Sequence, residues 1–244
     1  MFKSLDTEIE NYEETFEYVK SRVDVLIEEV NKRLPTRIDL SNISKYGSLY
    51  PYKLQVIKAS QLYRNHELAS SILMAFNSQN YTAAAILVRS FLESSALLFY
   101  IGKKINRTIE SNSTGDIDSI LMSALMGYSD GKKEKSKAKP IQVLTAVDHA
   151  EKRVPGYRRE YDHLSNYTHP NWFGSHNMYA KIKDGEYITE FDASLNNSKS
   201  SWNLVYPPLF LSLVLLIHSC DWIDKLTPEL TIMCDRNSPN HPSG

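Results

Sequence analysis

The chain has 244 residues, of which 42% are hydrophobic and 23% are charged. This is an ordinary globular composition, so we expect a sizeable core and no general disorder. The 28 basic and 29 acidic side chains nearly cancel. The protein as a whole is therefore not attracted to nucleic acid or to anionic membranes, and a partner of either kind needs a local patch.

We expect one α-helical domain over residues 1–234 and a flexible tail over residues 235–244. The acidic, amphipathic N-terminus is not a secretory signal. Cys220 lies in an apolar helical stretch and Cys234 at the edge of the C-terminal tail, and neither belongs to a zinc-type motif. These features predict no disulfide, no metal, no cofactor and a reducing, cytoplasmic location.

Two apolar runs are candidates for membrane-spanning helices. The run over residues 83–101 is interrupted by Arg89 and Glu93, and the run over 208–217 is only half of the roughly 20 residues that a spanning helix needs. We therefore expect both to be buried core helices and expect no membrane partner.

Hydrophobic periodicity predicts an all-α fold. Over residues 7–34, apolar side chains recur at three- and four-residue spacing, and Pro35 ends the pattern. This long N-terminal helix is interpreted either as a packing helix or as a dimerisation arm. Similar patterns predict helices over residues 52–76, 81–105, 117–126, 141–153, 157–169 and 202–226, with a loop over 107–116.

Two segments depart from the helical pattern. Apolar and polar residues alternate around Asp184-Gly185, which predicts a small β-hairpin near residues 178–191. The complete expectation is a bundle of about five to seven helices with this hairpin inserted. The basic run over 131–139, GKKEKSKAK, is expected to be a solvated loop that could contact phosphate.

Arg89 and Glu93 stand in the middle of a helix that is apolar on nearly every side and is capped by Asn80. Burying either charge alone would cost several kcal/mol, so each needs a partner or a wet cavity. The pair is either a structural salt bridge or the lining of a polar pocket.

The densest polar stretch is residues 157–174, YRREYDHLSNYTHPNWFG, with two arginines, two histidines and three tyrosines. We expect it to form a short helix and the turn that ends it, facing Arg89 and Glu93, so that the two segments together make the site.

Three chemistries fit this stretch. A Ser165–His169–Asp162 relay lacks an oxyanion-hole motif, and metal binding by His163 and His169 lacks a second carboxylate–histidine motif on a facing helix. The third is metal-free RNA cleavage, in which a histidine moves protons and an arginine stabilises charge on phosphorus.

A family resemblance favours RNA cleavage. Arg158, four intervening residues and His163 match the arginine-to-histidine spacing of the HEPN superfamily. The segments LVRSFLE (87–93) and YDHLSNYTHPN (161–171) are similar to those of an uncharacterised bacterial group of HEPN-like helical proteins, with a core over 52–226. The resemblance implies a homodimer that cleaves RNA as a toxin or antiphage effector.

The resemblance also implies roles for side chains. Arg158 or Arg159 would hold the phosphate, and His163 or His169 would transfer the proton. Arg89 and Glu93 would orient these groups from the central helix. In addition, Tyr161, Asn171 and Trp172 would shape the site or stack on substrate.

The sequence thus predicts a metal-independent, endoribonuclease-like HEPN effector. Two alternatives stay open. One is a non-catalytic module in which Arg89 anchors an anionic or nucleotide-like ligand, and the other is a purely structural dimeric helical protein.

Overall fold

The computed structural model describes residues 16–127, 139–183, 185, 187–192 and 198–236. It confirms the all-α bundle with a β-hairpin insertion. The helices are α2 (Phe16–Lys32), α3 (Leu49–Asn77), α4 (Tyr81–Glu110), α5 (Ile117–Met126), α6 (Val143–Glu151), α7 (Tyr157–Thr168), α8 (Asn177–Tyr179) and α9 (Ser198–Arg236). Two short turns, η2 (Leu40–Asn42) and the π-helical η3 (Trp172–His176), complete the helical elements of these residues.

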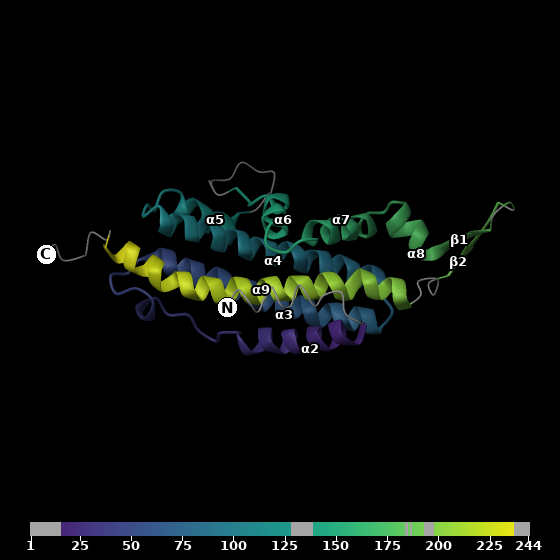
Figure 1. The fold of residues 1–244 in the computed structure, drawn as a ribbon, viewed down its shortest axis with the longest axis horizontal. Helices are drawn as coiled ribbons and strands as arrows, with labels where there is room; N and C mark the ends of the chain where they lie inside the picture. Colours follow the sequence, from purple (N-terminus) through teal and green to yellow (C-terminus); the bar gives the residue numbers. More distant parts are fainter. Residues whose placement is uncertain (1–15, 128–138, 184, 186, 193–197, 237–244) are drawn as a thin grey trace.

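The long helices α3, α4 and α9 run along the length of the molecule and pack on one another (Figure 1). Helix α2 covers this layer from one side by packing on α9 and α3. Helices α5, α6 and α7 lie on the other side and cover α4. Because α4 contacts α3, α9 and the covering helices, it is buried on nearly all sides, as its apolar sequence predicts.

The predicted hairpin is confirmed. Strands β1 (Ala180–Lys183) and β2 (Ile188–Phe191) are antiparallel, with Ala180 opposite Phe191. Gly185 has a φ of +82°, a backbone conformation that glycine adopts without steric cost. The hairpin projects beyond α8 from one end of the bundle (Figure 1).

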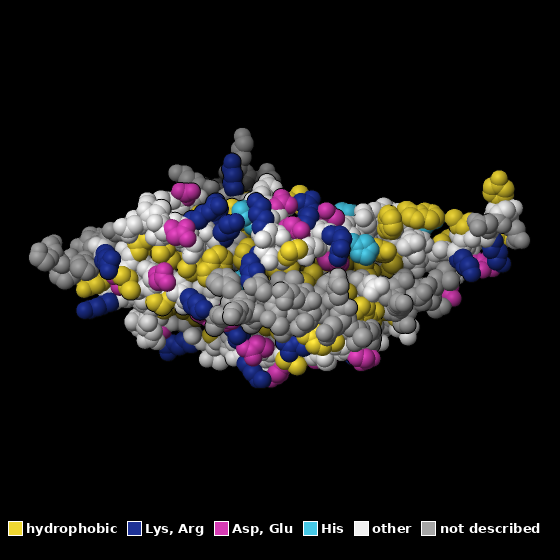
Figure 2. Space-filling view, in the orientation of Figure 1, with side chains coloured by type: hydrophobic (Ala, Val, Ile, Leu, Met, Phe, Trp, Pro, Cys, Tyr) yellow, Lys and Arg dark blue, Asp and Glu magenta, His cyan; other side chains and the backbone are white. Residues whose placement is uncertain are grey.

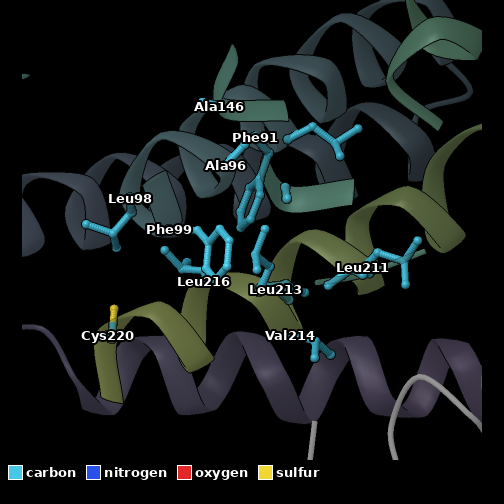
Figure 3. Packing of buried hydrophobic residues seen from close by; sticks show 14 of the residues in the cluster. Phe91, Ala96, Leu98, Phe99, Ala146, Leu211, Leu213, Val214, Leu216 and Cys220 are labelled. Carbon is cyan, nitrogen blue, oxygen red and sulfur yellow. The ribbon is translucent and has the colours of Figure 1, made fainter. Parts of the chain in front are cut away.

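The core lies where α4 faces α9. Phe91 and Phe99 of α4 point toward Leu213 and Leu216 of α9 (Figure 3), and all four side chains are buried. Burying a side chain of this size contributes about 1.5–3 kcal/mol, so each of these four contributes substantially to the stability of the bundle. Gly102 lets α9 approach closely, since a Cβ at this position would lie 3.3 Å from the Trp222 ring.

Helices α4 and α9 extend further than expected. The loop expected over residues 107–116 begins later in the structure, because α4 continues to Glu110 and its last turns still bury Ile105. The expected tail position of Cys234 is wrong. Helix α9 continues past Leu226 to Arg236, and Leu230, Met233 and Cys234 extend its buried face.

Other expectations fall outside the described residues: the start of the N-terminal helix over 7–15, most of the basic run at 131–138 and the end of the tail at 237–244. Helix α2 begins at Phe16 in the described part. Helix α7 agrees closely with the expected 157–169, and the Asn80 cap is confirmed by its side chain, which accepts a hydrogen bond from the Ala83 amide.

Helices α4 and α9 are long and apolar enough to cross a membrane by length and composition. In the most apolar stretch of each helix, the buried share is 61% for α4 and 83% for α9. A core helix of a globular protein meets the same criterion, so this is weak evidence for membrane insertion.

The packing of α4 on α9 leads to a stability prediction. Phe91→Ala removes a fully buried ring and should lower the free energy of unfolding by about 3–5 kcal/mol, as measured by urea denaturation. Ile86→Ala, on the same helix but 47% exposed, should change it by less than about 0.5 kcal/mol. Equal losses in the two variants would contradict this location of the core.

Candidate functional site

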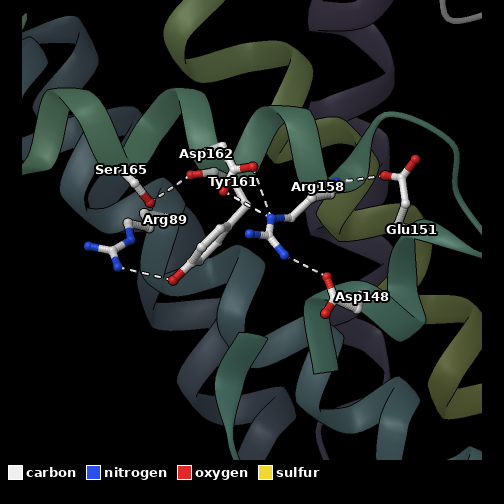
Figure 4. A network of polar contacts seen from close by, with 7 residues as sticks. All are labelled: Arg89, Asp148, Glu151, Arg158, Tyr161, Asp162 and Ser165. Atoms are coloured by element: carbon white, nitrogen blue, oxygen red, sulfur yellow. Dashed lines mark hydrogen bonds and ion pairs between the residues drawn. The ribbon is translucent and has the colours of Figure 1, made fainter. Parts of the chain in front are cut away.

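Arg89 joins the central helix to the polar helix. Its Nη1 donates a hydrogen bond to Thr168 Oγ1 at 3.0 Å, and its Nη2 donates to the Tyr161 hydroxyl at 3.1 Å. The Arg89 Cζ also lies 5.2 Å from the centroid of the Tyr161 ring, a cation–π contact. Arg89 therefore holds α7 against α4 at two points about two helical turns apart. Its contact with Tyr161 is drawn in Figure 4.

Glu93 is a weak partner of Arg89. The Glu93 Oε1 lies 3.4 Å from Arg89 Nε in an i,i+4 ion pair, and this Nε is buried without a hydrogen-bond acceptor. An arginine before a glutamate is the less favourable order for a helix pair. The main partners of Arg89 accordingly lie on α7, as the unfavourable order indicated.

Tyr157 forms a second attachment between these helices. Its ring is fully buried, and its hydroxyl donates to the Leu92 carbonyl oxygen at 2.8 Å. Burial raises the pKa of Tyr157 well above its ordinary value, so the hydroxyl stays protonated and acts as a donor. Tyr157, Tyr161 and Leu164 thus form the inner face of α7.

Arg158 ties α7 to α6. Its Nη1 lies 2.6 Å from Asp148 of α6, and its Nε donates to Asp162 at 2.9 Å. Hydrogen bonding, first to Asp162 and then to Asp148, raises the pKa of Arg158. Glu151 of α6 accepts from the Gly156 and Arg158 amides and so caps the start of α7 (Figure 4). Two carboxylates thus neutralise Arg158.

Arg159 and His163 lie one turn apart on the outer face of α7. The Arg159 side chain is 74% exposed, and its Nη2 lies 3.1 Å from the carboxylate of Glu160. His163 is exposed, and its ring meets the Tyr167 ring edge-on with centroids 5.1 Å apart. This face therefore presents a guanidinium and an imidazole to solvent.

A series of rings continues from His163 into η3, and we call it the ring strip: His163, Tyr167, Trp172, Phe173 and His176. Tyr167 and Phe173 have centroids 5.9 Å apart, and Trp172 and His176 are 5.1 Å apart. Trp172 is 54% exposed and Phe173 is 44% exposed. Exposed apolar side chains gather at this end of the molecule, between α7 and the hairpin (Figure 2).

His169 ends α7 and is exposed. Its carbonyl oxygen accepts from the Asn171 amide at 2.8 Å, and the Asn171 side chain caps η3 by accepting from the Gly174 amide. The Asn171 side chain therefore shapes the turn that carries Trp172 and Phe173.

The structure brings the two polar segments together through groups other than the histidines. Arg89 meets Tyr161 and Thr168, whereas within the described residues no hydrogen bond or ion pair links Arg89 or Glu93 to His163 or His169. The expected single recess is therefore split into an inner contact around Arg89 and an outer face with the imidazoles.

The other two chemistries gain no geometric support. Ser165 donates locally to the Tyr161 carbonyl oxygen at 2.8 Å, and Asp162 is paired with Arg158, so neither is directed at His169. In the part of the chain that the structure describes, no group of three or more His, Cys, Asp or Glu side chains could hold a metal ion.

Sequence reasoning missed Thr168 and His176. Thr168 was detectable, because it follows Tyr161 by seven residues and so shares its helical face. The contact of Trp172 with His176 depends on the π-helical turn η3, which has no simple sequence signal.

Comparison of the chain with known protein families, curated proteins and solved structures gave no significant match. The assignment of function therefore depends on the geometry and on the resemblance of short motifs.

The Arg89 attachment can be tested with a double-mutant cycle. Tyr161→Phe leaves a part-buried guanidinium nitrogen without its acceptor and should cost about 1–3 kcal/mol of stability. Arg89→Met should also destabilise the fold, and the double variant should lose less than the sum of the two. The measurement is urea denaturation of all four proteins.

The matched control is Tyr187→Phe, since Tyr187 is fully exposed on the hairpin. It should leave stability unchanged. Strict additivity of Arg89→Met and Tyr161→Phe would show that the two side chains do not interact energetically.

Proposed function

We propose that the protein is a metal-independent ribonuclease that binds single-stranded RNA on the outer face of α7, as an HEPN-like effector. The observation that carries this proposal is the exposed pair Arg159 and His163, one helical turn apart and continuous with the ring strip. A cation, a proton carrier and stacking rings are the groups that RNA cleavage without a metal requires.

The ring strip supports RNA as the substrate class. Exposed aromatic rings bind unpaired bases by stacking, worth about 1–3 kcal/mol per base and tolerant of sequence. Trp172 and Phe173 offer such rings directly after α7. Lys181 on β1, the strand that follows η3 and α8, is exposed and adds a positive charge for the backbone.

The assigned chemistry is an internal transesterification. Neutral His163 takes the proton of a ribose 2′-hydroxyl, and the 2′ oxygen attacks the adjacent phosphorus. The bond from phosphorus to the 5′ oxygen breaks, and that oxygen takes a proton from water. The products are a 2′,3′-cyclic phosphate and a 5′-hydroxyl, while Arg159 stabilises the charge on phosphorus.

The remaining predicted site residues have supporting roles in this proposal. Arg158 is paired with two carboxylates, Asp148 and Asp162, whereas Arg159 is paired with Glu160 and is 74% exposed, so the phosphate contact is assigned to Arg159. Arg89 and Glu93 lie behind α7 and act as positioning residues. His169, at the exposed end of α7, contacts the substrate beyond His163.

The proposal predicts cleavage of single-stranded RNA in the presence of a metal chelator. The rate should change with pH near neutrality, where an imidazole exchanges its proton. His163→Ala should lower the rate by about 10²–10⁴-fold, the usual contribution of a general base. The assay is gel analysis of a 5′-labelled RNA across a pH series.

His66→Ala is the matched control, because His66 lies on α3 away from α7, and it should retain full activity. The melting temperature of His163→Ala should equal that of the natural chain. RNA binding without cleavage would contradict the nuclease proposal and favour the non-catalytic alternative. The absence of both RNA binding and RNA cleavage would refute the proposal as a whole.

A further inference from the structure

A cluster of basic side chains lies on α4 and α6, away from the outer face of α7. We call it the α4–α6 basic cluster: Lys103, Lys104 and Arg107 of α4 with His149 of α6 and Lys152, the residue that follows α6. In Figure 2, basic side chains gather around a histidine over α6 and the adjoining part of α4. Among the described residues, none of the five forms an ion pair with a carboxylate.

The cluster has a defined geometry. Lys103 Nζ lies 3.1 Å from His149 Nδ1, so the ammonium donates to a neutral imidazole. His149 and Lys104 both contact Tyr100: the His149 and Tyr100 rings have centroids 5.2 Å apart, and Lys104 Nζ lies 5.4 Å from the Tyr100 centroid. The positive charges therefore share one side of two packed helices.

The neighbouring carboxylates are engaged elsewhere. On α6, Asp148 binds Arg158, and Glu151 caps α7. On α4, Glu110 accepts from Asn106 at 2.6 Å, and on α5 Asp118 pairs with Lys53. The basic cluster thus keeps its repulsion uncompensated within the described structure.

Burial and this repulsion together lower the pKa of the two partly buried members, His149 and Lys103. Burial lowers the pKa of His149, and the charges of Lys103, Lys152, Arg107 and Lys104 lower it further. Burial and then the charges of Arg107 and Lys152 lower the pKa of Lys103. A bound anion would reverse the electrostatic part of both shifts.

Paired cations elsewhere in the protein show the contrast. A cavity of about 600 Å³ beside the connector between α2 and α3 is lined by Arg33 and Lys58. Each of these is bound to an aspartate of α9, Arg33 to Asp221 and Lys58 to Asp224. A cluster in which cations lack such partners is the better candidate for an external anion.

We propose that the α4–α6 basic cluster is a binding site for a compact ligand that carries several phosphate groups. Three lysines and one arginine provide four positive charges within two adjacent helical segments, which suits a multiply charged anion better than a single carboxylate. Arg107 offers a planar fork for phosphate oxygens, and the lysines act as point charges. Lys103 donates to the ligand, and His149 gains a proton when the ligand binds.

The test uses the full chain and sodium tripolyphosphate as the probe, at constant ionic strength to hold general screening fixed. The melting temperature should rise with probe concentration, since the ligand binds the folded state. The apparent pKa of His149, followed by NMR and assigned with His149→Gln, should rise when the probe is present.

The double variant Lys103→Gln/Arg107→Gln should lose both responses. Without the probe it should melt no lower than the natural chain, because it removes like-charge repulsion. Lys20→Gln/Lys225→Gln removes the same net charge from exposed positions outside the cluster and should keep both responses. Equal responses in the two double variants, or no response in the natural chain, would overturn the proposal.

The phosphate groups could belong to a soluble molecule or to a lipid headgroup, and a second arm separates these sources. Vesicles of phosphatidylcholine with and without phosphatidic acid are sedimented with the protein. If the protein sediments only with vesicles that contain phosphatidic acid, and tripolyphosphate releases it, the ligand is a lipid headgroup at a membrane surface. If the protein sediments with neither kind of vesicle, the ligand is a soluble molecule. Both outcomes keep the site.

Single-stranded RNA serves as a competitor in the same assay. If RNA alone raised the melting temperature through Lys103 and Arg107 while tripolyphosphate had no effect, the compact-ligand proposal would be refuted. None of these readouts involves RNA cleavage, so failure here is distinct from failure of the proposed nuclease.

Discussion

Arg89 places a positive charge in the middle of α4, the helix with the most packed surroundings in the molecule. A part-buried guanidinium needs hydrogen-bond acceptors, and here the hydroxyls of Tyr161 and Thr168 provide them. Both acceptors belong to α7, so satisfying Arg89 fixes the rotation of α7 about its axis. The exposure of Arg159 and His163 follows from that rotation, because they lie on the opposite face.

Helix α7 therefore has two faces with separate tasks. The inner face packs and hydrogen-bonds through Tyr157 and Tyr161, and the outer face presents charge and imidazole to solvent. Arg158 lies between them and connects α7 to α6, whose C-terminal end carries His149 of the basic cluster, with Lys152 directly after it. Helices α6 and α7 form one layer on the central helix α4, and both of the anion-binding regions that we propose lie on this layer.

Much of the fold was predictable because its signals are local. The spacing of apolar residues located α3, α5 and α7, and Asp184-Gly185 located the hairpin. Cys234 was misplaced because the expected helix ended at residue 226, whereas α9 continues through Pro228 and buries Leu230 and Met233. Tertiary packing outweighed the local signal there.

The candidate site was predictable only in part. The sequence indicated that Arg89 must find partners and that residues 157–174 could provide them, since an unpaired buried charge is costly. It could not indicate which side chains of that stretch turn inward. Tyr161 and Thr168 do so, and the rotation that this imposes sends His163 outward. The basic cluster was also hidden, because Lys103 and His149 are 46 residues apart.

The most direct test of the central claim is an NMR titration of the full chain with a short single-stranded RNA whose 2′-hydroxyls are replaced by hydrogen, so that it binds without cleavage. The account predicts saturable shifts of the His163 imidazole and Trp172 indole signals at the same RNA concentration, with the buried Tyr157 signals unchanged. Shifts confined to residues outside α7 and η3, or no saturable shift, would contradict it.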